Sequence, residues 1–259
     1  MPNIRLLKNA RSDLKYINNN ELYKFSLNHT LSIYSLDAIC SFIPKNACSS
    51  LRYSVALANG FIKSIEDIKW IHKNNQTFKS TQRELALANF TFVVLRCPFR
   101  RVASSFLNKI VDRKLNFNNK DGASIKVNFS EFLQIIKSQN RSERDEHWRN
   151  QTDFLHYEEY DEYYSIETFK EAVNSLNKKG FDVIDTRNQL NHDLSKLEKI
   201  DGEFSFVKQN EIQKMKEDGY VPSYKSLFGV SEIDLVREIY RDDIELYSSK
   251  FGDKNLLFK

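Results

Sequence analysis

Short apolar runs, each followed by small residues and a helical pattern, recur in the first half of the chain. Residues 39–43 form an apolar run with the length of a buried strand. Pro44 ends that strand, because proline has no N–H to donate to a neighbouring strand. Small residues follow, and a helical pattern over residues 51–58 closes before Gly60. A buried strand, a short loop and a helix are therefore predicted here.

The same order of elements returns further along the chain. Residues 91–95 form a second apolar run, which predicts another buried strand. Arg96 stands at the end of this run, Pro98 marks a turn, and a helical pattern covers residues 101–111. Two buried strands that each lead into a helix favour an α/β fold, with a central parallel sheet and helices on both of its faces.

Helical and polar patterns predict further elements. Residues 80–88 look helical, and they begin with S-T-Q-R-E, in which a Ser or Thr N-cap and Glu84 make a capping box. Ser130 is predicted to cap a short helix over residues 131–138. The remaining segments are a lead-in with one helix or strand (1–32), a polar loop without periodicity (116–128), an amphipathic helix (167–176) and a long helix (230–247).

Composition narrows the class of protein. The 259 residues are 41% hydrophobic and 13% aromatic, which is enough to bury a substantial core. There is no internal repeat and no Gly- or Pro-rich linker, so we predict one domain over residues 1–259. The net charge of +4 is mild and no long basic run is present, so the charge pattern gives no indication of a nucleic-acid partner.

Cysteine usage and hydropathy bear on the compartment. Cys40, Cys48 and Cys97 are odd in number and lack metal-ligand spacing, so we expect a reducing compartment and no metal. No run of about 18 apolar residues occurs. Residues 1–20 are polar, unlike a signal peptide. We therefore predict a cytoplasmic enzyme without a transmembrane segment.

The loop after the first strand has the features of an anion-binding site. The N–H groups of the loop and of the first helical turn have no intrahelical partner, and the helix dipole favours negative charge there. Lys45 adds a full positive charge, and the Ser hydroxyls that follow add donors. The pattern G-x-x-x-x-G-K-[ST] is absent, so this is not a Walker nucleotide site.

Two motifs resemble those of a known enzyme family. The segment I-P-K-N-A-C-S-S-L-R resembles the 5′-phosphosulfate loop of sulfotransferases that use 3′-phosphoadenosine 5′-phosphosulfate (PAPS). The segment L-R-C-P-F-R-R-V-A-S-S-F resembles their 3′-phosphate motif, and the two motifs lie within residues 39–110 in the family's order. The segments H-W-R-N-Q and I-Y-R-D-D-I-E-L-Y are similar to those of the Golgi-type carbohydrate sulfotransferases (family 2) and their bacterial relatives.

The resemblance implies a P-loop NTPase-like sulfotransferase fold, a strand near residues 163–166 and a set of donor-binding residues. Lys45 would bind the bridging oxygen and neutralise the leaving adenosine 3′,5′-bisphosphate. Arg96 and Ser104 match the positions that bind the 3′-phosphate, and Lys208 lies where relatives have a lid over the nucleotide; Arg101 either matches a recurrent family arginine or only braces its helix. The 5′-phosphate would be held by the loop itself: Pro44, Lys45, Asn46, Ala47, Cys48, Ser49 and Ser50.

The resemblance leaves several candidates for the general base. Relatives use a histidine between the two motifs, and His72 is the histidine found there. His147 in D-E-H-W-R-N-Q is the rival, with Trp148 either stacking on a sugar or lying in the core. Histidine suits the role because its pKa lies near neutral pH. Asp145 and Glu146 are the further alternatives, since some sulfotransferase branches use an acidic base. We expect His29, His156 and His192 to be structural.

The acceptor implied by the resemblance is a carbohydrate hydroxyl, on a polysaccharide or on a glycolipid, and a lipid-linked acceptor would add peripheral membrane contact. Insertions over residues 61–80 and 112–150 would select it. Two other functions stay open. An ATP-dependent phosphotransferase would need a Ser or Thr after the loop lysine and an acidic strand end, where this chain has Asn46 and Arg96. The other open function is that of a nucleotide-binding relative without catalytic activity.

Overall fold

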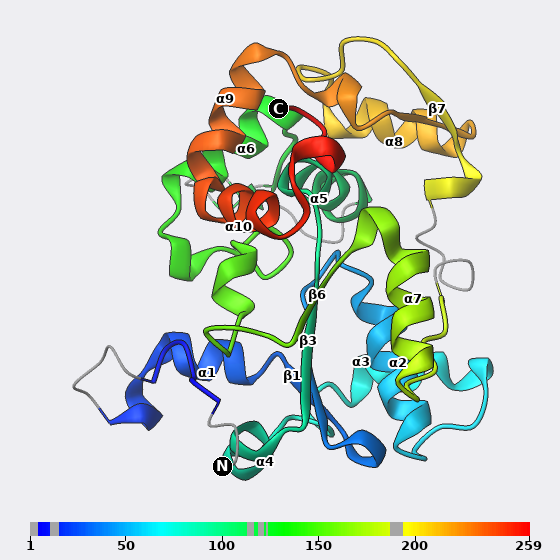
Figure 1. Ribbon diagram of the computed structural model, residues 1–259. Coiled ribbons are helices and arrows are strands. Elements are labelled where there is room, and N and C mark those ends of the chain that lie inside the picture. Colours follow the sequence, from blue (N-terminus) through cyan, green and yellow to red (C-terminus); the bar gives the residue numbers. More distant parts are fainter. Residues whose placement is uncertain (1–4, 11–15, 113–116, 119–121, 123, 187–193) are drawn as a thin grey trace. The chain divides into compact units, whose positions relative to one another are not determined.

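The chain forms two compact units in a computed structural model that describes residues 5–10, 16–112, 117–118, 122, 124–186 and 194–259 (Figure 1). The first unit comprises Met1–Arg96 and Asn150–Leu190, and the second comprises Cys97–Arg149 and Asn191–Lys259. The single domain predicted over residues 1–259 stays a prediction.

The first unit is built on a four-stranded sheet in the order β1–β2–β3–β6. Strands β2, β3 and β6 run parallel, and β1 pairs antiparallel with β2 at one edge. The predicted α/β fold is confirmed, with the difference that the central sheet is mostly and not wholly parallel. The four strands are β1 (Thr30–Ile33), β2 (Ala38–Ser41), β3 (Phe90–Leu95) and β6 (Glu162–Ser165).

Helices flank this sheet. In Figure 1, α2 and α7 lie on one side of the strands and α1 lies on the other side. The capping box predicted from S-T-Q-R-E is confirmed at the start of α4, where Thr81 and Glu84 each accept the other's main-chain N–H. The helices of this unit are α1 (Glu21–Leu27), α2 (Cys48–Ala58), α3 (Trp70–Lys73), α4 (Gln82–Leu87) and α7 (Phe169–Lys178), and its short 3₁₀ segments are Ile17–Asn19, Tyr34–Leu36, Ile65–Lys69, Gln151–Phe154 and Ile166–Thr168.

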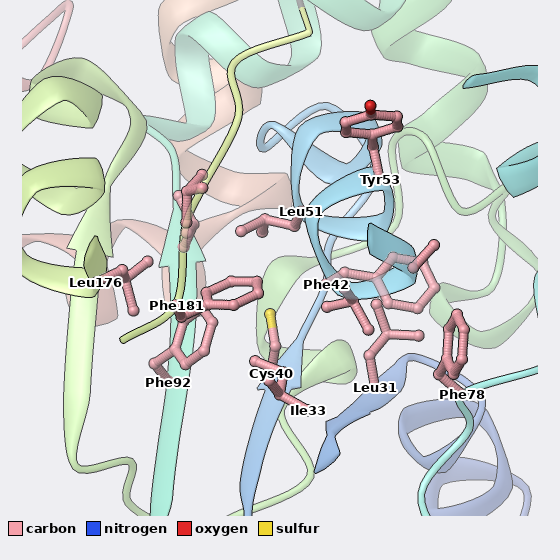
Figure 2. Packing of buried hydrophobic residues seen from close by; sticks show 14 of the residues in the cluster. Leu31, Ile33, Cys40, Phe42, Leu51, Tyr53, Phe78, Phe92, Leu176 and Phe181 are labelled. Carbon is pink, nitrogen blue, oxygen red and sulfur yellow. The ribbon is translucent and has the colours of Figure 1, made fainter. Parts of the chain in front are cut away.

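The core of the first unit lies between the sheet and helices α2 and α7 (Figure 2). Alternate strand residues point into it, as the two-residue period of a strand requires. Cys40 from β2 and Phe92 from β3 meet Leu51 from α2 and Leu176 from α7 in this cluster. Burial on both sides explains why the β2 and β3 segments are apolar almost without interruption.

Polar side chains on the opposite side of the sheet are paired inside the unit. Ser41 Oγ of β2 lies 2.7 Å from the hydroxyl of Tyr160. His156 is buried, with Nδ1 2.9 Å from Ser26 Oγ, and burial lowers its pKa to about 4. His29 is also buried and packs against aromatic rings. These two histidines therefore have the structural surroundings that we predicted, and His192 lies outside the described residues.

The second unit is mainly helical. Its core gathers aromatic rings, among them Phe106, Phe129, Phe132 and Trp148, whose ring centroids lie 5.3–6.4 Å apart in the pairs 106–129, 106–132, 129–132 and 132–148. Two small sheets complete it, one antiparallel (β4–β5) and one parallel (β7–β8). Its elements are α5 (Pro98–Ser105), a π-helical turn (Phe106–Ile110), β4 (Phe117–Asn118), β5 (Ser124–Ile125), α6 (Phe129–Ser138), β7 (Glu198–Ile200), α8 (Gln209–Glu217), β8 (Tyr220–Pro222), α9 (Val230–Ile239) and α10 (Arg241–Phe251), with 3₁₀ segments at Arg141–Glu143, Leu194–Lys196, Lys225–Leu227 and Asp253–Asn255.

Several predicted helix bounds were wrong. The helix predicted over residues 51–58 already begins at Cys48, and the one predicted over 101–111 begins at Pro98, where proline is well suited to a first helical turn. Asn128, rather than Ser130, caps α6. The long helix predicted over residues 230–247 is two helices that meet at Tyr240, whose backbone (φ −118°, ψ 29°) is not helical.

The polar loop predicted over residues 116–128 is described only in part. Residues 116, 119–121 and 123 lie outside the described residues. In the described part, β4 and β5 pair Phe117 with Ile125 and Asn118 with Ser124. This segment therefore contains strand pairing that its aperiodic sequence did not indicate.

Candidate active site

The two motifs follow the carboxyl ends of two neighbouring strands of the first unit, β2 and β3. Parallel pairing sets Ser41 at the end of β2 beside Val93 near the end of β3. The carboxyl ends of the two strands are therefore adjacent, and that end of an α/β sheet is where ligands commonly bind. The loop that leads to α2 and the strand-end residue Arg96 follow directly.

The loop before α2 has an unusual backbone. Lys45 (φ 73°) and Ala47 (φ 57°) both lie in the left-handed region, which residues other than glycine rarely adopt. Ala47 is also the N-cap of α2, and its methyl side chain cannot cap the helix. The N–H of Asn46 donates to Ile43 O (3.1 Å) within the turn. No side chain caps the first turn of α2, and main-chain N–H groups at such a helix start can bind an anion.

Arg96 ties the two motifs together. Its Nη1 donates to the main-chain oxygen of Lys45 at 2.8 Å, across the gap between the ends of β2 and β3. Asn46 makes a second link, because its Nδ2 donates to Val94 O at 3.0 Å. The structure therefore brings together Lys45, Asn46 and Arg96, which the sequence placed in separate motifs.

Gln151 belongs to the same network, and the sequence analysis did not select it. Its Oε1 accepts from Asn46 Nδ2 (2.6 Å) and from the N–H of Arg96 (3.0 Å), and its Nε2 donates to Arg96 O (2.9 Å). The only sequence signal was its place as the last letter of H-W-R-N-Q. Its partners are more than 50 positions away along the chain, so no local pattern could have identified them.

The small residues of the loop differ in burial and in their contacts. Ser50 is buried, and its Oγ accepts the N–H of Thr186 (3.0 Å) and lies 3.2 Å from Thr186 Oγ1. Cys48 and Ser49 are partly exposed at the start of α2. The Ser50 side chain therefore holds α2 to the segment that contains Thr186.

In the second unit, one buried arginine supports the segment that carries His147. Arg101 donates from Nη1 to Arg149 O (2.6 Å) and from Nη2 to Glu146 O (3.0 Å). Ser105 Oγ donates to His147 O at 2.6 Å. Arg101 thus braces this segment, and its role as the recurrent family arginine stays a prediction. Tyr240, at the break between α9 and α10, donates from its hydroxyl to Trp148 O at 2.6 Å.

His147 is paired with Asp145. The carboxylate accepts the His147 main-chain N–H (2.9 Å) and ring Nδ1–H (2.6 Å). Because an ionised carboxylate only accepts, the proton lies on Nδ1 and the neutral ring has Nε2 free of a proton. Burial, with help from Lys109, lowers the pKa of His147 below its usual value and outweighs the opposite effects of Asp145 and Glu146. The ring is therefore neutral at neutral pH and able to accept a proton at Nε2.

The other predicted residues belong to both units. His72 lies exposed on the short helix α3 of the first unit. In the second unit, Ser104 is buried on α5, and Lys208 pairs with Glu131 at 2.6 Å. Trp148 is only 4% exposed, so it is a core residue and has no free face for a sugar.

A family model described as "Sulfotransferase family" matches residues 37–249. The chain belongs to the sulfotransferase family. The protein is therefore a transferase of sulfuryl groups, which confirms the general class implied by the two motifs. A comparison with curated proteins and one with solved structures each found no match.

Two further findings describe the sulfotransferase as a whole. Among the helices that the structure describes, none has both the length and the apolar character needed to span a bilayer. Within the described ranges, no three His, Cys, Asp or Glu side chains come together as metal ligands would. The three cysteines are free thiols, and burial raises the pKa of Cys40.

Proposed function

We propose that this sulfotransferase moves a sulfuryl group from PAPS to a carbohydrate hydroxyl. The observation that carries the proposal is the contact between the two motifs, in which Arg96 Nη1 donates to Lys45 O at 2.8 Å. A donor with one phosphate at its 5′ side and another at its 3′ position needs two cationic subsites at a fixed separation. Lys45 and Arg96 supply two such charges beyond the adjacent carboxyl ends of β2 and β3.

The residues of the first unit fit such a donor. The uncapped start of α2 offers main-chain N–H groups and the positive end of a helix dipole to the 5′-phosphate. Arg96 has a planar guanidinium that suits a phosphate dianion, and the resemblance to the family's 3′-phosphate motif supports Ser104 as a hydroxyl donor to the same group. Lys45 supplies the charge that neutralises the oxygen released from sulfur.

The sulfuryl transfer breaks one S–O bond and forms another. The acceptor hydroxyl oxygen bonds to sulfur, the S–O bond to the 5′-phosphate breaks, and adenosine 3′,5′-bisphosphate leaves with the electron pair. The hydroxyl proton must pass to a base. As in phosphoryl transfer, the protein contributes alignment and charge stabilisation more than covalent chemistry.

We assign the base to His147 in preference to His72. Its ring is held by Asp145 with Nε2 free of a proton, which is the form that a general base requires. His72 is exposed on a helix of four residues. Asp145 accepts two hydrogen bonds from His147, which makes it an orienting group and a poorer base.

A carbohydrate acceptor is supported by the likeness of H-W-R-N-Q and of the closing helix to the carbohydrate subgroup. A sugar on a polysaccharide or on a lipid-linked intermediate would present the hydroxyl. We propose the cytoplasm as the compartment of this chain. Free thiols at Cys40, Cys48 and Cys97 are in keeping with a reducing environment.

The test is a transfer assay with ³⁵S-labelled PAPS against a panel of glycans, read by mass spectrometry, with ATP as the competing donor. We expect a labelled glycan and binding of adenosine 3′,5′-bisphosphate by calorimetry. Binding without transfer to any acceptor would favour a non-catalytic relative, and preference for ATP would contradict the donor.

The base is tested by the pH profile. Because the pKa of His147 lies below 6.5, the wild-type rate should rise with pH through an apparent pKa below about 6.5 and then level off. His147→Ala should abolish transfer while nucleotide affinity is retained, and His72→Ala should have a mild effect. The reverse pattern would assign the base to His72.

A further inference from the structure

The amide of Gln151 contacts both motif loops at once. It lies at the start of the 3₁₀ segment Gln151–Phe154 and is only 1% exposed. Its oxygen accepts from Asn46 Nδ2 and from the N–H of Arg96, and its nitrogen donates to Arg96 O, at 2.6, 3.0 and 2.9 Å. All three bonds lie within the first unit, and each polar atom of the amide is used.

The loop that Gln151 contacts needs support. Asn46 stands between Lys45 and Ala47, both of which have positive φ, and a strained backbone persists only where its surroundings hold it. Asn46 is completely buried, and its Nδ2 is shared between Val94 O and Gln151. Removing Gln151 would leave the part-buried N–H of Arg96 without its side-chain acceptor and would weaken the hold on Asn46.

We propose that Gln151 is a positioning residue that couples the Lys45–Ala47 loop to Arg96, so that the sites for the two phosphate groups of the donor act as one. This proposal rests on the proposed function, because it assumes a ligand with a 5′- and a 3′-phosphate. Gln151 itself need not touch the ligand. Its amide fixes the separation of the two loops, and a ligand that spans both loops depends on that separation.

Two adenine nucleotides separate a coupling role from a merely structural one. Gln151→Ala should weaken adenosine 3′,5′-bisphosphate by about tenfold or more, as loss of a buried hydrogen-bond partner predicts, and adenosine 5′-phosphate by much less. The affinities are measured by calorimetry. Asn46→Ala removes the other end of the link, so the Asn46→Ala/Gln151→Ala double variant should lose little more than Asn46→Ala alone.

Asn59→Ala is the matched control. Its amide also bridges two main-chain groups, donating to Ser32 O (2.9 Å) and accepting from the N–H of Tyr34 (3.0 Å), but at the opposite end of α2. This variant should lower the melting temperature and leave both nucleotide affinities within about twofold. If Gln151→Ala behaves like Asn59→Ala, Gln151 is only structural and the proposal is wrong.

Hydrogen exchange of the protein without nucleotide tests the coupling between the two loops even if the proposed donor is incorrect. Gln151→Ala should speed exchange in peptides covering residues 43–50 and in peptides covering residues 95–100 together, and Asn59→Ala should not. Faster exchange in both with no nucleotide binding by the wild type would overturn the donor and uphold the coupling. Unchanged exchange in either segment would overturn the coupling. Should Gln151→Ala not fold, Gln151→Glu keeps the acceptor but cannot donate to Arg96 O, and it is judged by the same two measurements.

Discussion

Helices α2 and α6 begin in opposite ways. At the start of α6, Asn128 Oδ1 accepts the N–H of Glu131 and the Glu131 carboxylate accepts the N–H of Asn128, each at 2.8 Å. Lys208 adds an ion pair to the same carboxylate at 2.6 Å. At the start of α2 the N-cap is Ala47, with φ at 57°, and no side chain closes the first turn.

The difference separates a helix start that serves stability from one that serves binding. A side-chain cap contributes about 0.5–2 kcal/mol, and α2 forgoes this contribution. Two left-handed residues add backbone strain at the same place. In exchange, the first-turn N–H groups of α2 remain available to an anion. The variants below are expected to affect activity at α2 and folding at α6.

The largest effect is expected at Lys45. Lys45→Ala should lower turnover by about 10²-fold, because the lost charge is needed most when the leaving phosphate develops. Donor affinity should fall far less than turnover, and the melting temperature should change little, as measured by calorimetry and thermal unfolding. Lys137→Ala removes an exposed lysine that pairs with Glu238 in the second unit, and its turnover should equal that of the wild type. An unchanged turnover for Lys45→Ala would remove Lys45 from the mechanism.

The next effect concerns ligand discrimination beside α2. Arg96→Ala should weaken adenosine 3′,5′-bisphosphate by about 1.5–3 kcal/mol, the usual contribution of a charged hydrogen bond. Ser104→Ala should act in the same direction with a smaller loss. Adenosine 5′-phosphate lacks the 3′ group, so its affinity should be nearly constant in both variants. Equal losses for the two nucleotides would mean that the 3′-phosphate is bound elsewhere.

At α6 the effect should fall on stability alone. Asn128→Ala removes the cap and should lower the free energy of unfolding by about 1 kcal/mol, as measured by urea denaturation. Turnover of the folded enzyme should be unchanged. A loss of turnover comparable to that of Lys45→Ala would contradict the division between the two helix starts.

The smallest effect is a pH dependence at the same cap. Burial tends to raise the pKa of Glu131, but bonds from Lys208 and from the N–H of Asn128 outweigh it and lower the pKa below its usual value. The cap therefore contributes fully above about pH 4.5, and its contribution is lost as the pH falls through the lower folded-state pKa. Glu131→Gln should accordingly cost more stability at pH 6 than at pH 3. Equal costs at both pH values would show that the charge is not needed.

Strands β2 and β3 were predicted well from the sequence, β1 was not located, and the ends of the helices were predicted poorly. Residues 39–43 and 91–95 are apolar because both faces of the sheet are covered, and an apolar run of this length can be recognised from the sequence alone. Helix α2 begins three residues earlier than predicted, because the small residues from Cys48 to Ser50 carry no hydrophobic period. The break at Tyr240 was missed for the opposite reason, since the apolar period continues across it.

The site could be predicted only where single residues are diagnostic. Lys45 and Arg96 were found because they are charges at the ends of apolar strands. The positive φ of Lys45 and of Ala47 was not predictable, because it is imposed by tertiary contacts and not by residue type. Gln151 was missed because its function lies in three hydrogen bonds to distant segments.

The first unit is discontinuous along the chain, and this has a consequence for folding order. Strand β6 pairs with β3 through Val94 and Tyr164, yet residues 97–149 of the second unit lie between them in sequence. Closing so long a loop costs chain entropy before the pairing returns any energy, so this step is expected late and slow. During synthesis the Lys45–Ala47 loop and Arg96 therefore leave the ribosome well before Gln151. A nascent chain can form the two loops early and link them through Arg96 and Lys45, but the bridge made by Gln151 can form only after residues 97–149 have been made.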